Sequence, residues 1–184
     1  PGCYELPMGI PLSAIIEESA GGMLPGSKFK AAIPGGASTK FMPESMYHTP
    51  MDYATLNESD FRLGTGAVMV FDHKTCLVDV TANLIVFFAR ESCGWCTPCR
   101  EGLPYILDLL RRIERGEGEK SFIPMLRQMC SHMAHSYCAF ALGAAAPVEG
   151  LIDHFEDEIV AHIEGQGCPF KHRKADRTNA EAGH

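Results

Sequence analysis

Three cysteines stand at every third position of one short segment, and this spacing constrains the fold more than any other feature of the sequence. Residues 91–102 read ESCGWCTPCREG, which places Cys93, Cys96 and Cys99 in a single loop. Thiols held this close together are typical of ligands to a shared metal centre, with a further ligand supplied from elsewhere in the chain. A metal site at this loop therefore requires a fold in which a distant residue returns to it.

The sequence contains eight cysteines and no basic-then-apolar leader at its start. Because cytosolic reductants keep thiols reduced, we interpret the cysteines as metal ligands or free thiols rather than as a disulfide framework. Cys3, Cys76 and Cys168 are isolated in the sequence, and we interpret them as small apolar residues or exposed bystanders. The chain starts with Pro1 instead of Met, which leads us to expect a piece of a longer protein.

Composition and charge argue against two classes of protein. With 184 residues, of which 46% are hydrophobic, the chain can form one ordinary domain or two small ones. A net charge of −7, with no basic block before the C-terminal tail, argues against a nucleic-acid partner. No apolar run approaches the roughly 20 residues that a membrane-spanning helix needs. We therefore expect any link to a membrane to run through partner proteins.

Residues 1–72 have the composition of a small α+β domain. They are rich in Gly and Pro, and turns break their apolar runs into short pieces. We expect strands at residues 3–9, 28–33 and 66–71, and a short helix at residues 11–19.

From residue 73 onward, apolar residues recur with the period of a helix. The apolar stripes cover residues 77–88, 103–113, 123–133 and 148–163. We expect Thr75 to cap the first helix, and Thr97 and Pro98 to be the cap and first residue of the second, which Gly116 ends. The fourth helix is expected to start at Pro147 and to end at Gly165. Four amphipathic helices with short connections favour an antiparallel bundle over residues 73–165. Residues 166–184 have few large apolar side chains, and we expect a disordered tail there.

The bundle topology indicates which residue joins the three clustered cysteines. In an up-down-up-down bundle, the connector between the first two helices lies at the same end as the connector between the last two. The first connector contains Cys93, Cys96 and Cys99, and the second contains Cys138. We therefore predict Cys138 as the fourth ligand. Cys130, which falls within the third helix, is the alternative.

Four cysteines do not identify the metal, because zinc and iron-sulfur clusters both accept four thiolates. Zinc sites usually pair their ligands as two C-x2-C knuckles, whereas C-x2-C-x2-C with one remote cysteine is typical of a [4Fe-4S] cluster. The spacing therefore favours a [4Fe-4S] cluster, with a zinc site and free or redox-active thiols as alternatives.

Several blocks of the sequence together resemble one protein family. The segments PGCYELPMG, GTGAVMVFD, ESCGWCTPCREG and YCAFALGAAAPVEGLIDHF resemble, in their order and context, the C-terminal half of the NADH-binding flavoprotein subunit of bacterial respiratory complex I, NADH:quinone oxidoreductase. The resemblance implies a [4Fe-4S] cluster on Cys93, Cys96, Cys99 and Cys138. It also implies an α+β fold, in which a small β-grasp domain of the soluble ligand-binding type is followed by an antiparallel four-helix bundle that carries the cluster.

The resemblance further implies a function in electron transfer. In the family, FMN takes hydride from NADH in an upstream domain that has a glycine-rich segment, and the cluster passes single electrons toward the next iron-sulfur subunit. This sequence has no such segment, so we expect neither a catalytic residue nor an FMN or NAD site in it. The implied partners are other iron-sulfur subunits of the NADH-oxidising module, in the cytoplasm and peripheral to the inner membrane. The alternatives are the equivalent subunit of an NAD-linked hydrogenase or formate dehydrogenase, and a zinc-stabilised protein-interaction module.

Three residues close to the clustered cysteines have two interpretations each. Arg90 and Arg100 flank the loop, either as cations that tune a cluster or as helix-end and surface charges. Trp95 lies inside the loop and either shields a cluster from water or packs as a large loop residue. The sequence leaves both interpretations open for all three.

Overall fold

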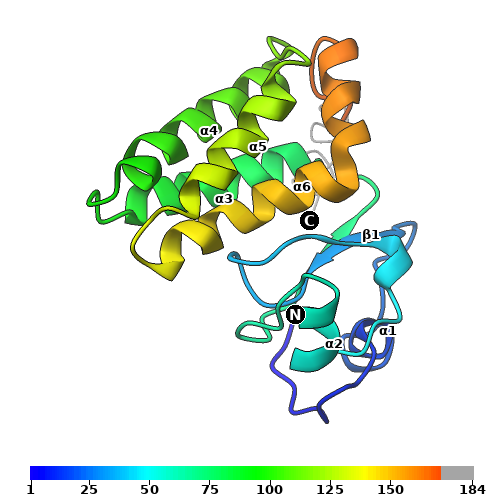
Figure 1. Cartoon of the computed structure of the whole chain (residues 1–184). Helices are drawn as coiled ribbons and strands as arrows, with labels where there is room; N and C mark the ends of the chain where they lie inside the picture. The colour runs from blue at the N-terminus through cyan, green and yellow to red at the C-terminus, as the bar shows by residue number, and fades with distance from the viewer. Residues whose placement is uncertain (171–184) are drawn as a thin grey trace. The chain divides into compact units, whose positions relative to one another are not determined.

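The chain divides into two compact units. The structure, a computed structural model, describes residues 1–170. One unit comprises residues Pro1–His73, and the other begins at Lys74. Figure 1 shows that strands and short helices make up the first unit and that long helices make up the second. The chain therefore contains both helices and strands, segregated along the sequence, which agrees with the predicted α+β class.

The first unit contains a three-stranded antiparallel sheet with the strand order β2-β1-β3. The central strand β1 (Phe29–Ile33) pairs with β2 (Met42–Pro43) along one edge and with β3 (Met69–Asp72) along the other. Two of the predicted strands correspond to β1 and β3. Strand β2 is not predicted from the sequence, because two residues are too few to produce an alternating pattern.

The prediction of a strand at residues 3–9 is wrong. This segment forms neither strand nor helix, and the side chains of residues 1–8 are exposed. Pro7 has no amide hydrogen to donate to a neighbouring strand, and Gly9 adopts a positive φ of 86°. The segment therefore has neither the backbone conformation nor the buried face that a strand requires.

Short helices of the first unit surround one apolar core. They are α1 (Leu12–Ala14), the π-helical η1 (Ile15–Ser19), the 3-10 helix η2 (Glu44–Met46) and α2 (Tyr53–Glu58). The predicted helix at residues 11–19 corresponds to α1 and η1. The core consists of Leu12, Ile16, Ala32, Met42, Met51, Leu56, Phe61 and Leu63.

The second unit is built from four helices that pack on one another. They are α3 (Leu77–Glu91), α4 (Thr97–Arg115), α5 (Phe122–Met133) and α6 (Ala139–Glu164). Helix α3 packs on α4 and α6, helix α4 on α5 and α6, and helix α5 on α6 (Figure 1). Within the described residues, none of the helices has the length and apolar character needed to cross a membrane.

The start of α3 differs from the prediction by one residue. Cys76 caps the helix, because its sulfur accepts a hydrogen bond from the amide of Asp79 at 3.3 Å. The predicted cap, Thr75, lies outside the helix. Helix α4 begins at Thr97, which is one residue before its predicted first residue Pro98, and Cys96 rather than the predicted Thr97 is its N-cap. The helix continues through Pro104 without ending.

Helix α6 begins at Ala139, eight residues before the predicted start at Pro147. The additional part is rich in alanine, and Ala141, Ala144 and Ala145 are buried. Alanine has the highest helix propensity, but small residues make no strong apolar stripe, so the periodicity underestimates such a helix. The helix deviates at Phe155, where φ is −140° and ψ is 30°, and its C-cap is Gly165.

Gly116 ends helix α4 in the left-handed conformation, with φ of 81°. A side chain at this position would also collide with the backbone of Gln166, so glycine is required for close approach as well as for conformation. This approach brings the segment after α6 against the end of α4, and Cys168 is buried there. The predicted tail, residues 166–184, is thus described only as far as Phe170, and residues 171–184 lie outside the described residues.

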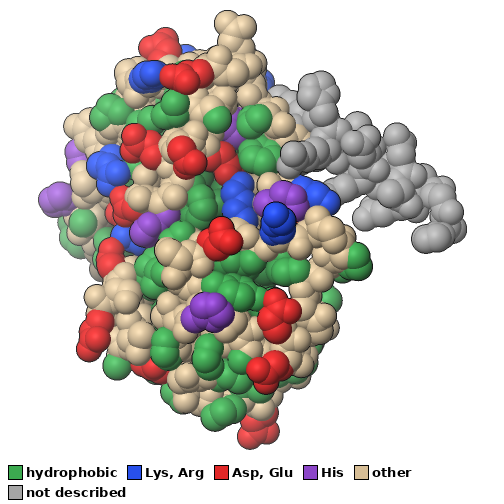
Figure 2. All heavy atoms as spheres, turned by 90° about the vertical axis from the view of Figure 1, so that its right-hand side faces the viewer, with side chains coloured by type: hydrophobic (Ala, Val, Ile, Leu, Met, Phe, Trp, Pro, Cys, Tyr) green, Lys and Arg blue, Asp and Glu red, His purple; other side chains and the backbone are tan. Residues whose placement is uncertain are grey.

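Charged side chains of both signs are interspersed on the face of the molecule shown in Figure 2. Acidic residues outnumber basic ones in the sequence, 23 to 16.

Candidate metal centre

One cavity in the second unit is lined by all four cysteines of the predicted site. Its lining residues are Glu91, Ser92, Cys93, Cys96, Cys99, Ser136, Cys138, Phe140 and Ala141. Cys93, Cys96 and Cys99 come from the α3–α4 connection and the start of α4, and Cys138 comes from the α5–α6 connection. Two connections that are distant in the sequence therefore meet at this cavity.

Helix starts position three of the four thiols. Cys96 is the N-cap of α4, Cys99 lies in the first turn of the same helix, and Cys138 is the N-cap of α6. The first amides of a helix have no partner within the helix and carry a partial positive charge, which favours anions such as thiolates. Cys93 lies in the loop and is exposed, whereas Cys99 is buried. The cavity thus combines a protected inner side with an accessible outer side.

Hydrogen bonds hold the cysteine loop in shape. Arg100 donates from Nη1 to the carbonyl oxygen of Gly94 at 2.9 Å, which ties the loop to the first turn of α4. The Ser92 hydroxyl accepts a hydrogen bond from the Gly94 amide at 3.3 Å and lies 3.2 Å from the Cys99 sulfur. The amide of Tyr137 donates to the Cys96 sulfur at 3.4 Å. These polar contacts reach two of the sulfurs directly.

Cys130 lies apart from the cavity. It is buried within α5, and its sulfur is 4.0 Å from the carbonyl oxygen of Ala145. It is not among the residues that line the cavity. The structure therefore groups Cys138, and not Cys130, with the three clustered cysteines.

The donor set of the cavity fits an iron-sulfur cluster. Each iron of a [4Fe-4S] cluster takes one thiolate, and four thiols line this cavity. Phe140 and Ala141 supply apolar lining, and the ring of Phe140 packs edge-on against that of Phe88, with 5.6 Å between ring centroids. A cavity of four thiols and apolar lining is the environment that such a cluster occupies.

The residues flanking the loop differ in their roles. Arg90 pairs with the adjacent Glu91 at 2.8 Å, and both side chains are largely exposed, which fits a helix-end charge. Arg100 pairs with Glu101 at 2.8 Å in addition to its contact with the loop. Trp95 is 79% exposed, so it does not pack into the loop as a core residue.

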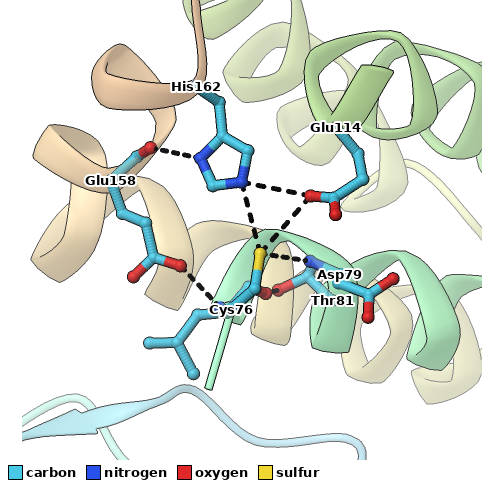
Figure 3. A network of polar contacts seen from close by, with 7 residues as sticks. Cys76, Asp79, Thr81, Glu114, Glu158 and His162 are labelled. Atoms are coloured by element: carbon cyan, nitrogen blue, oxygen red, sulfur yellow. Dashed lines mark hydrogen bonds and ion pairs between the residues drawn. The ribbon is translucent and has the colours of Figure 1, made fainter. Parts of the chain in front are cut away.

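A second cluster of potential metal ligands is not predicted from the sequence. Ligand atoms of Cys76, Glu114, His162 and Cys168 all lie within 4.8 Å of one another, and we call these four residues the buried Cys-His cluster. Figure 3 shows the side chains of Cys76, Glu114 and His162 converging from three helices. From the sequence we interpret Cys76 and Cys168 as small apolar residues or exposed bystanders; both are buried, as small apolar residues are, but they lie beside polar groups, whereas Cys3 is exposed. Residues separated by up to 92 positions leave no local motif, so only the fold reveals the cluster.

Burial changes the protonation of this cluster. Removal from water raises the pKa of the Cys76 thiol far above its ordinary value, and it also raises the pKa of Cys168. Burial alone would raise the pKa of Glu114 as well, but hydrogen bonds from His162, Cys168 and Cys76 outweigh it and lower that pKa. The pKa shifts therefore favour the neutral form of the two thiols and the charged form of the carboxyl group.

Known proteins that resemble this chain include iron-sulfur proteins, which agrees with the thiol lining of the cavity. Residues 79–162 match the family model described as the NADH-ubiquinone oxidoreductase-F iron-sulfur binding region. The chain is 47% identical over 171 residues to the F 2 subunit of NADH-quinone oxidoreductase from Rhizobium meliloti, covering 92% of this chain and 41% of that protein. It is 45% identical over 166 residues to the F subunit of NADH-quinone oxidoreductase from Escherichia coli, covering 89% of this chain and 37% of that protein. The chain thus spans about two-fifths of the length of these relatives.

Solved structures give a second line of similarity. A structure of an NAD+-reducing [NiFe]-hydrogenase in the air-oxidized state matches with a TM-score of 0.72 and 31% identity, over 91% of this chain and 28% of that one. The H2-reduced state matches with a TM-score of 0.74 and 28% identity, over the whole of this chain and 32% of that one. The predicted resemblance is confirmed: the chain is similar over most of its length to part of the F subunits of NADH-quinone oxidoreductases, and residues 79–162 match the model of their iron-sulfur binding region.

Proposed function

We propose that this chain, like the part of the NADH-quinone oxidoreductase F subunits that it resembles, holds a [4Fe-4S] cluster on Cys93, Cys96, Cys99 and Cys138 and relays single electrons within an NADH:quinone oxidoreductase. The observation that carries the proposal is the convergence of these four thiols on one cavity from two connections. When bound there, the cluster supplies one-electron redox chemistry.

The chain's own residues then fix and tune the redox centre. Cys96 and Cys138 are the N-caps of α4 and α6, and the partial positive charge of these helix starts favours negative charge at the site. The amide of Tyr137 and the hydroxyl of Ser92 contact two of the sulfurs, and such hydrogen bonds shift reduction potentials. Phe140 and Ala141 limit the access of water on one side.

We assign electron entry and exit to partner proteins or segments. FMN and NADH binding is proposed for the part of the relatives that this chain does not match, and other iron-sulfur subunits of the NADH-oxidising module are the proposed electron acceptors. Trp95 and Tyr137 are 79% and 86% exposed and are adjacent in sequence to two of the cysteines. Exposed aromatic side chains at this position suit a surface that a partner covers during electron transfer. Through such partners the chain would be peripheral to the inner membrane on its cytoplasmic side.

The proposed architecture follows the same resemblance. We propose that residues 1–72 form a β-grasp domain of the soluble ligand-binding type and that residues 73–165 form the antiparallel four-helix bundle. The central position of β1 in an antiparallel sheet and the mutual packing of α3, α4, α5 and α6 support this assignment.

The equivalent subunit of an NAD-linked hydrogenase is the second candidate. The similarity to an NAD+-reducing [NiFe]-hydrogenase over 91% of this chain favours it. In both candidates the four cysteines hold the cluster, and the difference lies in the partners. Copurification with quinone-reductase or hydrogenase subunits from the source cells distinguishes them.

Replacement of single cysteines tests the ligand assignment. Cys138→Ala should lose the cluster or retain fewer than four irons per chain, because one iron loses its thiolate. Cys130→Ala is the matched control, and it should retain iron and sulfide at the level of the unmodified protein, since Cys130 lies outside the cavity. Iron and acid-labile sulfide are measured in both variants after anaerobic purification. The reverse pattern of iron retention would show that the ligand assignment is incorrect.

A further inference from the structure

The buried Cys-His cluster has the composition of a closed metal site. It offers two sulfurs, one imidazole nitrogen and one carboxylate oxygen, a mixture that zinc accepts. Two thiols are too few for the four irons of a [4Fe-4S] cluster, so this site differs in kind from the cysteine cavity. Cys76 and Cys168 also lie outside residues 79–162, the region matched by the iron-sulfur family model.

The distances within the cluster approach those of a tetrahedron around one ion. With metal bonds of about 2.0 Å to nitrogen or oxygen and about 2.3 Å to sulfur, tetrahedral ligands lie about 3.3–3.8 Å apart. His162 Nε2 lies 3.1 Å from Glu114 Oε2 and 3.3 Å from the Cys76 sulfur. The Cys76 sulfur lies 3.4 Å from Glu114 Oε2. An ion at the centre therefore requires these three ligands to separate by only a few tenths of an ångström.

A second layer of contacts orients the ligands. His162 Nδ1 lies 2.7 Å from the carbonyl oxygen of Glu158, which can only accept, so Nδ1 donates to it and Nε2, which faces the cluster, is the nitrogen left to bind an ion (Figure 3). This arrangement is the usual support of a metal-binding histidine. The Asp79 amide donates to the Cys76 sulfur at 3.3 Å and favours its thiolate. The carboxylate of Glu158 is used elsewhere, since its Oε1 accepts from the Leu77 amide at 2.6 Å.

Burial and position indicate a structural site. His162 is fully buried, and Cys76 and Cys168 are nearly so. Cys76 caps the start of α3, Glu114 lies in the last turn of α4, and His162 lies in the last turn of α6. Cys168 follows α6 in the segment that Gly116 allows to approach α4. An ion bound here would join three helix ends and this segment.

We propose that Cys76, Glu114, His162 and Cys168 bind one structural zinc ion. All four positions of a tetrahedral ion are then filled by protein ligands, which is the pattern of structural rather than catalytic zinc. Binding replaces the thiol protons of Cys76 and Cys168 by the metal and stabilises the folded state. The proposal does not depend on the assignment of the [4Fe-4S] cluster, because the two sites share no residue.

Metal analysis of the cluster-loaded protein tests the proposal. The chain is purified without oxygen, incubated with one equivalent of Zn2+, desalted, and analysed for zinc and iron. We expect about one zinc per chain in addition to the iron, with zinc-edge X-ray absorption showing two sulfur neighbours at about 2.3 Å and two nitrogen or oxygen neighbours at about 2.0 Å. Failure to retain zinc would reduce the cluster to a hydrogen-bond network and overturn the proposal. Zinc surrounded by four sulfurs would also overturn it, because that ion would occupy the cysteine cavity.

Two single variants distinguish this site from the iron-sulfur site. Cys168→Ser should lose the retained zinc and melt at a lower temperature, while it keeps its iron and its EPR signal. Cys130→Ala, a change of another buried cysteine in the same unit, should keep both metals. Retention of zinc by Cys168→Ser at the level of the unmodified protein would contradict the proposal. If this variant does not fold, the zinc ligands that X-ray absorption identifies in the unmodified protein still test the proposal.

Discussion

At the scale of single residues, Arg100 connects the cysteine loop to the helix that follows it. Its guanidinium donates to the Gly94 carbonyl, and Gly94 has a positive φ of 77° between Cys93 and Cys96. Arg90, on the other side of the loop, pairs with its neighbour Glu91. The two arginines flank the same loop, but among the described hydrogen bonds only that of Arg100 reaches the loop backbone.

Replacement of Arg100 by Gln should loosen the loop without removing a ligand. One exposed hydrogen bond stabilises the loop by about 0.5–1.5 kcal/mol. Its loss should therefore make the release of iron to a chelator roughly two- to tenfold faster. Arg90→Gln is the matched control and should release iron at the rate of the unmodified protein. The measurement is the loss of cluster absorbance with time in the presence of an iron chelator. Equal rates for Arg100→Gln and Arg90→Gln would show that the Gly94 contact does not hold the loop.

At the scale of secondary-structure elements, helix starts carry much of the chemistry. The N-caps of α4 and α6 are Cys96 and Cys138, that of α3 is Cys76, and that of α2 is Asp52. Hydrogen bonds from the amide and hydroxyl of Thr55 lower the pKa of Asp52. The contribution of this carboxylate is therefore fully present above its unfolded-state pKa and is lost as the pH falls through its lower, folded-state pKa.

The change Asp52→Asn isolates this effect, because Asn is an equally good cap but does not titrate. We expect the stability of the unmodified protein, relative to Asp52→Asn, to be constant above about pH 5 and to fall as the pH drops below about 4. Urea midpoints of the two proteins measured across this range give the comparison. A difference that stays constant down to the lowest pH would show that the Asp52 cap does not contribute through its charge.

The elements also show what can be predicted from the sequence. Long helices with strong apolar stripes are predictable, and Gly116 and Gly165 mark the ends of two of them. The predicted start of α6 is too late because alanine gives no stripe, and α2 is not predicted because six residues are too few for helical periodicity. The spacing of the cysteines together with the helix order is enough to predict which four thiols meet.

At the scale of the whole molecule, the cysteine cavity and the buried Cys-His cluster both belong to the unit that begins at Lys74. The cavity is predictable because three of its thiols are close in the sequence. The buried cluster is not, because each of its residues comes from a different part of the chain and is brought in by a helix end or by the segment after α6. The two proposed sites can be tested separately, since the cavity is expected to bind iron and sulfide and the buried Cys-His cluster is expected to bind zinc.

The central claim is that the four cysteines of the cavity hold a redox-active [4Fe-4S] cluster. Its most direct test is the iron and acid-labile sulfide content of anaerobically purified protein, combined with a low-temperature EPR spectrum before and after reduction with dithionite. We expect about four irons and four sulfides per chain and a signal that appears only on reduction. A chain that takes up no iron even after anaerobic reconstitution, and that gives no signal on reduction, would contradict this claim.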